Sequence, residues 1–157
     1  MELLKIATLD NSGIITRTKV GMFKDYIMRY YFDIIFVGEI TNPDIVNLRR
    51  YEAYLNIATT MRGTAIVPRS EIPLTNVTIL PTGRAVAAES RGIKLIKLYA
   101  PSGTAKMNKR KRFYNTEHPL LLPAEYRKII LRVTSIVYLT PLTQLVFLKQ
   151  PIPRRYC

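Results

Sequence analysis

The chain has 157 residues, of which 48% are hydrophobic, and a formal net charge of +13. This length allows one domain with a real core, and the composition excludes a disordered protein. The single cysteine, Cys157, excludes a disulfide framework, and one cysteine with one histidine excludes a structural zinc site. Residues 1–20 lack a signal-peptide layout, so we expect an intracellular protein, nuclear or cytoplasmic.

The first elements predict a βαβ-like unit. Residues 3–10 are a strand-like apolar run that ends on Asp10, and "NSG" follows as a turn. Between Thr16 and Tyr31, apolar residues recur at steps of three and four, which predicts an amphipathic helix with Val20, Phe23, Ile27 and Tyr30/Tyr31 on its apolar side. "FDIIFVGEIT", residues 32–41, is a buried strand with Glu39 near its far end. A strand, a helix and a strand in this order favour parallel neighbours in a layered α/β sheet.

The middle of the chain predicts short strands. "RGTAIVPRS", "LTNVTILPTG", "RAVAAES" and "GIKLIKLYAP" are separated by turn signals, and we interpret them as an antiparallel meander. "SGTAKMNKRKRFYNTEHPLL" follows, and its centre is predicted to be helical, with Met107, Phe113 and Leu120 as its apolar positions.

Positive charge is concentrated in the second half. After residue 90 there are fourteen Lys/Arg against two acids, Glu117 and Glu125. Such a field favours nucleic acid first and an anionic membrane surface second. Candidate DNA-binding side chains lie in "KMNKRKR", which also fits a nuclear-import signal or a solvated helix start; they are Lys106, Lys109, Arg110, Lys111 and Arg112.

A membrane span is the weakest interpretation of the C-terminal region. Residues 129–148 are about as long as a membrane-spanning helix requires. However, Arg132, Pro141 and Gln144 interrupt the apolar run, and β-branched residues are dense in it. We therefore do not expect a membrane partner.

Two acids follow two predicted strands that a single helix joins. If these strands are neighbours, Asp10 and Glu39 approach within a few ångströms, which suits Mg²⁺ beside a phosphate. Acids at strand ends are also common as solvated loop entries, so the pattern alone leaves both interpretations open. No P-loop is present.

Several stretches together resemble the apurinic-like endonuclease domain of non-LTR retrotransposons, in the endonuclease/exonuclease/phosphatase superfamily. They are "KIATLDNSGI", "FDIIFVGEITNP", "RGTAI", "LPTGRAVA" and "IKLIKLYAPSGTAKMNKRKRFYN". The resemblance implies a four-layered α/β sandwich with mixed, mostly antiparallel sheets, Mg²⁺ dependence and DNA phosphodiester hydrolysis that nicks a target site. It implies that Glu39 binds the metal, with Asp10 as a second candidate ligand and catalytic residue. Tyr99 of the "Y-x-P" motif would be a phosphate-side donor, and Ser102 would be the small polar residue after it.

The sequence departs from the family at several points. Asp10 and Ser12 stand where Asn-x-Asn or Asn-x-Asp is usual, and Gly38 stands where Gln is usual. The Gly-Asp-Phe-Asn motif, whose aspartate activates water, and the Ser-Asp-His motif, which supplies a histidine, are missing. The fold class is therefore expected to be an incomplete sandwich over residues 1–131, followed by a divergent tail over 132–157. Nicking is expected to be weak or absent, and the alternative is a non-catalytic basic nucleic-acid-binding protein.

A one-base deletion offers an explanation for the missing motif. "RVTSIVYL", residues 132–139, stands where Gly-Asp-Phe-Asn belongs. With suitable third codon bases, one added G in the codons for Arg132 and Val133 changes the translation to Arg-Gly-Asp-Phe-Asn-Cys-Val-Leu. On this hypothesis the tail is translated out of frame, and its apolar character is an accident of the shift.

Sequencing the gene tests this hypothesis directly. We expect the codons for residues 130–139 to encode Gly-Asp-Phe-Asn in a neighbouring frame. Codons that give the motif in neither alternative frame would exclude a single-base shift.

Overall fold

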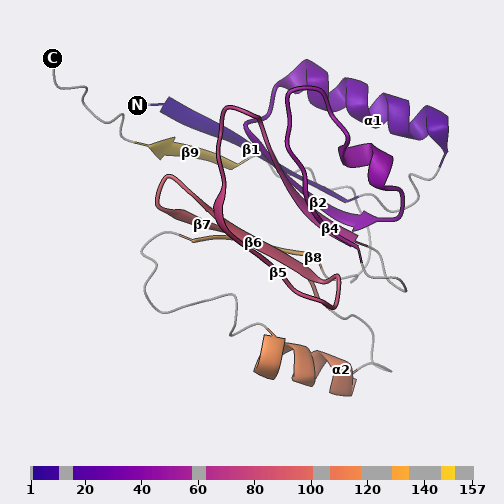
Figure 1. Ribbon diagram of the computed structural model, residues 1–157, viewed down its shortest axis with the longest axis vertical. Coiled ribbons are helices and arrows are strands. Elements are labelled where there is room, and N and C mark those ends of the chain that lie inside the picture. The colour runs from indigo at the N-terminus through magenta and orange to yellow at the C-terminus, as the bar shows by residue number, and fades with distance from the viewer. Residues whose placement is uncertain are drawn as a thin grey trace, which may run out of the picture.

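The computed structural model describes residues 2–10, 16–57, 63–100, 107–117, 129–134 and 146–150. They form two sheets that lie face to face, with α1 on the outer side of the first sheet and α2 beyond the second (Figure 1). This order of helix, sheet, sheet and helix is the four-layered α/β sandwich that the resemblance implied.

The first sheet has the strand order β3-β4-β2-β1-β9. Its strands are β1 (Glu2–Asp10), β2 (Ile34–Ile40), β3 (Tyr54–Asn56), β4 (Gly63–Pro68) and β9 (Val146–Gln150), and the short 3-10 helix η1 (Pro43–Val46) follows β2. β1 and β2 are parallel neighbours, as the βαβ pattern predicts, whereas β4 and β9 run antiparallel to their partners.

The helix α1 (Arg17–Tyr30) connects these two parallel strands. Thr16 caps its N-terminus, since its side-chain oxygen accepts a hydrogen bond from the backbone N–H of Lys19. The predicted apolar stripe is confirmed at Val20, Phe23 and Ile27, which are buried. It ends there, because Tyr30 and Tyr31 are exposed at the last turn.

The second sheet has the strand order β5-β6-β7-β8. Its strands are β5 (Thr75–Ile79), β6 (Ala85–Ser90), β7 (Ile93–Tyr99) and β8 (Ile129–Thr134). β5, β6 and β7 form an antiparallel meander, but the expectation of four consecutive meander strands is wrong. The strand at 63–68 is β4, which pairs with β2 and β3 in the other sheet.

The helix α2 (Met107–Arg112) continues into one π-helical turn, η3 (Phe113–Glu117). The two predicted apolar positions within it differ in their surroundings. Phe113 is buried in an apolar cluster with Ile96 and Leu98 of β7, whereas Met107 is 59% exposed. Phe113 therefore anchors this helical segment on the outer face of the second sheet.

Residues 129–148, for which a membrane span was the weakest interpretation, contain strands where the structure describes them. β8 lies at 129–134 and β9 at 146–150, and β8 crosses the expected boundary between residues 131 and 132. Among the described residues, no helix is both long and apolar enough to cross a bilayer.

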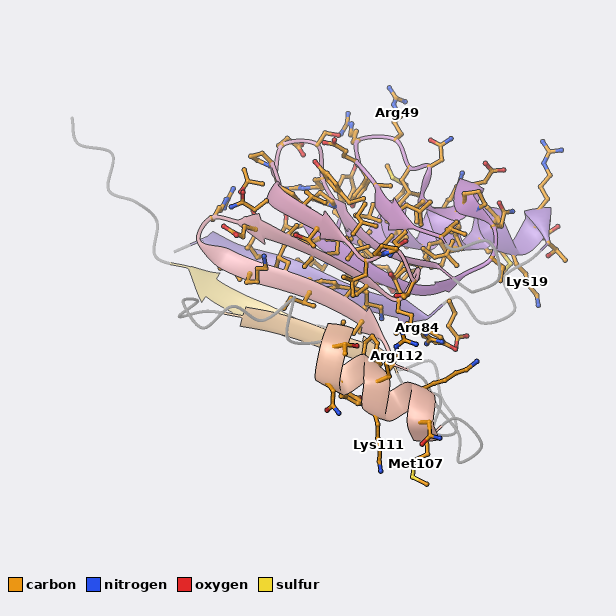
Figure 2. All side chains as sticks on the ribbon, turned by 60° about the horizontal axis from the view of Figure 1, so that its bottom comes forward. Lys19, Arg49, Arg84, Met107, Lys111 and Arg112 are labelled. Carbon is orange, nitrogen blue, oxygen red and sulfur yellow. The ribbon has the colours of Figure 1, made fainter. Side chains whose placement is uncertain are left out.

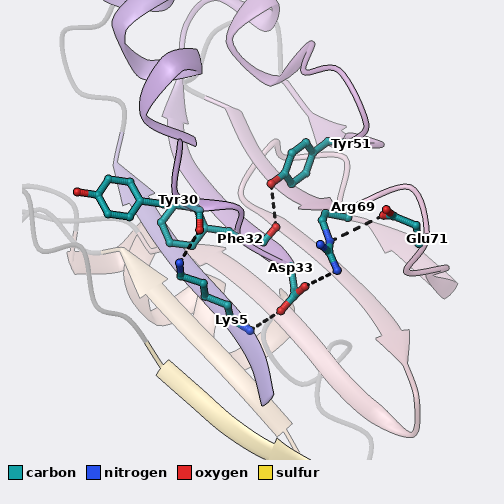
Figure 3. Close-up of polar contacts among 7 residues, drawn as sticks. All are labelled: Lys5, Tyr30, Phe32, Asp33, Tyr51, Arg69 and Glu71. Atoms are coloured by element: carbon teal, nitrogen blue, oxygen red, sulfur yellow. Dashed lines mark hydrogen bonds and ion pairs between the residues drawn. The ribbon is translucent and has the colours of Figure 1, made fainter. Parts of the chain in front are cut away.

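Asp33 joins the three central strands of the first sheet at one end (Figure 3). Its backbone N–H donates to the carbonyl of Lys5 at 2.7 Å, and its carbonyl accepts from the N–H of Arg69 at 2.9 Å. Its carboxylate accepts from the backbone N–H of Lys5 at 2.6 Å and pairs with the Arg69 guanidinium at 2.8 Å. One residue at the start of β2 therefore aligns β1 on one side and β4 on the other.

A tyrosine supports the same junction. The hydroxyl of Tyr51 donates to the carbonyl of Phe32 at 2.8 Å. Burial raises the pKa of Tyr51 to about 12, so the hydroxyl stays protonated and keeps this hydrogen bond throughout the physiological pH range.

The Asp33 junction predicts a stability effect. Asp33→Ala removes an acceptor from a backbone N–H and leaves the Arg69 guanidinium without its nearer carboxylate, so we expect a loss of about 2–4 kcal/mol in the free energy of unfolding. Urea unfolding followed by circular dichroism measures this loss.

Glu71→Gln is the matched control for the junction. The Glu71 side chain is 66% exposed, and its carboxylate lies 3.8 Å from the Arg69 guanidinium. Because exposed ion pairs contribute little, this substitution should change stability by less than about 0.5 kcal/mol. Equal losses of stability in Asp33→Ala and Glu71→Gln would contradict the stabilising role of Asp33 at this junction.

Candidate phosphate-binding centre

The layer between the two sheets is apolar at one end and polar at the other. The apolar end contains Leu4, Ile6, Ile34, Phe36, Ile66, Val86, Leu95 and Ile93. Because side chains alternate between the two faces of a strand, the next inward positions along these strands can be assigned. They are Thr8 on β1, Glu39 on β2, Thr64 on β4, Arg84 before β6, and Lys97 and Tyr99 on β7. The candidate residues Glu39 and Tyr99 thus lie at the same polar end.

A β-bulge turns Glu39 into this layer. β2 and β4 pair regularly from Ile34 to Val37, and the register shifts between Val37 and Ile40. Val37 and Ile40 both pack in the outer core beneath α1, so two residues separate them where regular alternation allows one. Glu39 has a φ of 55° and is 4% exposed. A positive φ is uncommon for a residue with a side chain, and bulges of this kind re-aim a side chain next to functional sites.

The register places Asp10 beside this bulge. In the parallel pairing of β1 with β2, Leu9 lies opposite Val37 and Asp10 lies opposite Gly38, one residue before Glu39. The predicted proximity therefore holds for the two backbone positions. The side chain of Asp10 is outside the described part of the structure, so its role as a ligand stays a prediction.

Hydrogen bonds hold the turn before β6 against the first sheet. Thr64, which faces the Glu39 bulge across the β2–β4 pair, donates from Oγ1 to the carbonyl of Gly83 at 3.4 Å. Asn56 of β3 donates from Nδ2 to the carbonyls of Leu80 at 2.5 Å and Ala85 at 3.0 Å. The segment 80–85 of the second sheet is thereby fixed at the level of Glu39.

Arg84 and Tyr99 form a unit at the edge of this end. The N–H of Tyr99 donates to the Arg84 carbonyl at 2.7 Å, and the Arg84 guanidinium donates back to the Tyr99 carbonyl at 3.3 Å. The guanidinium also lies over the Tyr99 ring, 5.6 Å from its centroid. Arg84 is only 7% exposed. A guanidinium held in this way is well suited to bidentate contact with phosphate.

Sequence reasoning missed both Arg84 and Lys97. Arg84 follows the Pro-Thr-Gly turn and resembles an ordinary solvated cation. Lys97 lies in a run in which apolar residues dominate and is 1% exposed. Its position two residues before Tyr99, on the same side of β7, is the local signal that could have identified it.

The segment that stands where the resemblance expects Gly-Asp-Phe-Asn starts at the same end. β8 is parallel to β7, and Thr134 lies opposite Tyr99 in the register. The hypothetical frameshift would restore the motif across 133–136. The place at which the resemblance expects a water-activating aspartate therefore adjoins Tyr99 in the fold.

The basic helix is exposed beyond the second sheet. Lys109, Lys111 and Arg112 are exposed, and Figure 2 shows Lys111 and Met107 projecting away from the sheets. Ser102 and Lys106 lie outside the described residues, as does the side chain of Arg110. The predicted roles of these three residues stay predictions.

The described side chains supply few metal ligands. They contain no group of three or more His, Cys, Asp or Glu that could hold a metal ion. Mg²⁺ needs only one or two protein carboxylates when water and substrate phosphate complete its shell. Glu39 with Asp10 would meet this minimum.

Comparison with known proteins identifies the fold. No protein-family model and no curated protein matches the chain. Solved structures do match: an AP endonuclease from Archaeoglobus fulgidus (TM-score 0.64, 18% identity), the 3'-5' exonuclease NExo from Neisseria meningitidis (0.65, 15%) and D. rerio TDP2 complexed with single strand DNA product (0.63, 17%). The matches cover 83%, 83% and 86% of this chain, respectively. The same matches cover 56%, 57% and 60% of the lengths of those three chains, so this chain spans less than two thirds of each. The expected mixed α/β class is confirmed: the chain has the endonuclease/exonuclease/phosphatase fold over part of the length of these proteins.

Proposed function

We propose that this chain is a DNA-binding domain derived from the apurinic-like endonuclease of a non-LTR retrotransposon, with an incomplete phosphodiester-cleaving centre. The polar end of the inter-sheet layer carries the proposal. A bulge turns Glu39 into it, β1 brings Asp10 beside that bulge, and Arg84 and Tyr99 stand at its edge. The three solved structures with this fold come from DNA-processing proteins, and the resemblance in motif order supports the retrotransposon ancestry.

Each proposed role follows from residue chemistry. Glu39 and Asp10 would hold Mg²⁺, which when bound polarises a phosphoryl oxygen and lowers the pKa of bound water. The Tyr99 hydroxyl would donate to a phosphate oxygen, with Ser102 beside it. The Arg84 guanidinium would supply positive charge to the same phosphate.

Cleavage needs more than these groups. A water molecule must lose a proton as it attacks phosphorus, and the leaving oxygen must be stabilised. Residues 1–157 contain neither Gly-Asp-Phe-Asn nor Ser-Asp-His, so within them the family's water-activating aspartate and its histidine have no counterpart. Binding of a DNA phosphate can persist without them, because it depends on cations and hydrogen-bond donors.

A nicking assay tests the catalytic part of the proposal. With Mg²⁺ and supercoiled plasmid, we expect activity at least about 10³-fold below that of an intact endonuclease of this fold, because residues of a catalytic unit act together. Glu39→Ala should leave the residual rate unchanged. Robust nicking that Glu39→Ala abolishes would show that the centre is complete.

Salt-dependent binding tests the DNA-binding part. In EDTA, replacing Lys109, Lys111 and Arg112 by Gln should weaken binding to duplex DNA and reduce the slope of log K against log salt by about 2–3. The matched control replaces Arg17, Lys24 and Arg29 of α1, which lies on the opposite side of the two sheets (Figure 1). Equal losses in the two variants would mean that net charge, rather than α2, determines binding.

The alternative is a non-catalytic basic nucleic-acid-binding protein without this ancestry. The +13 charge and the exposed cations of α2 favour it. The two candidates differ at Glu39: the endonuclease ancestry accounts for a buried carboxylate on a bulge beside Asp10, whereas the alternative gives this residue no part in binding.

A further inference from the structure

Two buried lysines of β7 face opposite sides of the second sheet. Lys94 is 6% exposed and pairs with Glu89, its register partner on β6, at 3.7 Å. It lies between Ile93 and Leu95, which pack in the inter-sheet core, so Lys94 is on the outer face.

Lys97 is on the inner face. Its register partner on β6 is Val86, which packs in the inter-sheet core, as does Leu95 two residues before it. At 1% exposed, Lys97 is among the largest fully buried side chains described. Its ammonium therefore lies in the layer between the sheets.

A buried ammonium requires a nearby anion, since the cost of removing it from water is large. Among the described side chains, Glu39 is the one buried carboxylate. Lys97 and Glu39 lie at similar heights along the strands. Thr64, which faces the Glu39 bulge, donates a hydrogen bond to Gly83 of the second sheet. Asn56, the register partner of Thr64, donates one to Ala85, which pairs with Leu98, the residue after Lys97. β2 also lies against β7 across the layer.

We propose that the ammonium of Lys97 neutralises the carboxylate of Glu39 and thereby occupies the electrostatic role of a divalent cation at this centre. The inference rests on the proposed location of the phosphate-binding centre. A lysine and a metal ion cannot both approach one carboxylate without repulsion, because like charges in a poorly hydrated layer interact strongly.

Two consequences follow for this chain. Lys97 competes with a metal ion for Glu39, so the affinity of Glu39 and Asp10 for Mg²⁺ is lower than it would be without this lysine. Phosphate binding there is metal-independent, because Arg84 supplies a further fixed cation at the edge of the same layer.

Titration calorimetry with Mn²⁺, a substitute for Mg²⁺ that binds carboxylates more tightly, tests the proposal. The wild type should show no binding at about 1 mM Mn²⁺. Lys97→Met, which keeps the length of the side chain and removes its charge, should bind Mn²⁺ about 5–150-fold more tightly, the usual range for two coupled binding events. The double variant Lys97→Met with Glu39→Gln should lose this gain.

Lys94→Met is the matched control. It removes the other buried lysine of the same strand, on the opposite face, and should leave Mn²⁺ affinity at the wild-type level. Lys97→Arg keeps the charge and should also behave as the wild type. Wild-type binding as tight as that of Lys97→Met, or a gain that survives Glu39→Gln, would overturn the proposal.

Loss of Lys97 leaves Glu39 buried without its cation and is expected to lower stability. Thermal unfolding in EDTA and in Mn²⁺ therefore accompanies the titration. A raised melting temperature in Mn²⁺ for Lys97→Met, absent in the wild type, supports the proposal. If Lys97→Met folds under neither condition, the test uses the wild type alone. Binding of Mn²⁺ by the wild type at about 1 mM, lost in the Glu39→Gln variant, would then contradict the proposal.

The DNA-binding assay in EDTA separates this inference from the proposed function. If Lys97→Met gains Mn²⁺ affinity but the protein does not bind DNA, the proposed function is rejected and the proposed role of Lys97 stands. If the protein binds DNA but the wild type already binds Mn²⁺ tightly, the role of Lys97 is rejected and the proposed function stands.

Discussion

The alignment of β1 with β2 by Asp33 is the constraint on which the rest of the structure depends. This residue bonds the backbones of both Lys5 and Arg69 and uses its carboxylate on the same two residues. A shift of one residue in either pairing would move every side chain of the strand to the other face. The apolar inner layer, the core beneath α1 and the position of Asp10 beside the Glu39 bulge all follow from this one register.

The consequence of this arrangement is a layer whose polar end buries charge. An inter-sheet core is usually apolar throughout, because an unpaired buried charge is strongly unfavourable. Here Glu39, Lys97 and Arg84 lie at one end and Phe36, Ile66 and their neighbours at the other. The apolar end supplies the packing that holds the sheets together, so this packing does not depend on the charged groups at the polar end.

The fold and the chemistry carry different information. The sandwich that this chain shares with solved structures of 15–18% identity shows its fold, and it does not establish cleavage. On the proposed function, the cations of α2 and of the polar end suit an anionic polymer, and residues 1–157 contain neither motif that would supply the groups that activate water. Binding and cleavage depend on different parts of such a centre, so one can outlast the other.

The sequence alone determined the elements that depend on local periodicity and the motifs that carry the resemblance. The three- and four-residue steps of α1 predicted Val20, Phe23 and Ile27 as core, and the βαβ order predicted β1 beside β2. Tertiary structure decided the rest. It placed β4 in the first sheet, added the extra residue that turns Glu39 inward, and brought Lys97 and Arg84 to the same end. These outcomes depend on pairing between strands distant in sequence, and periodicity along one strand carries no information about its partner or about a bulge.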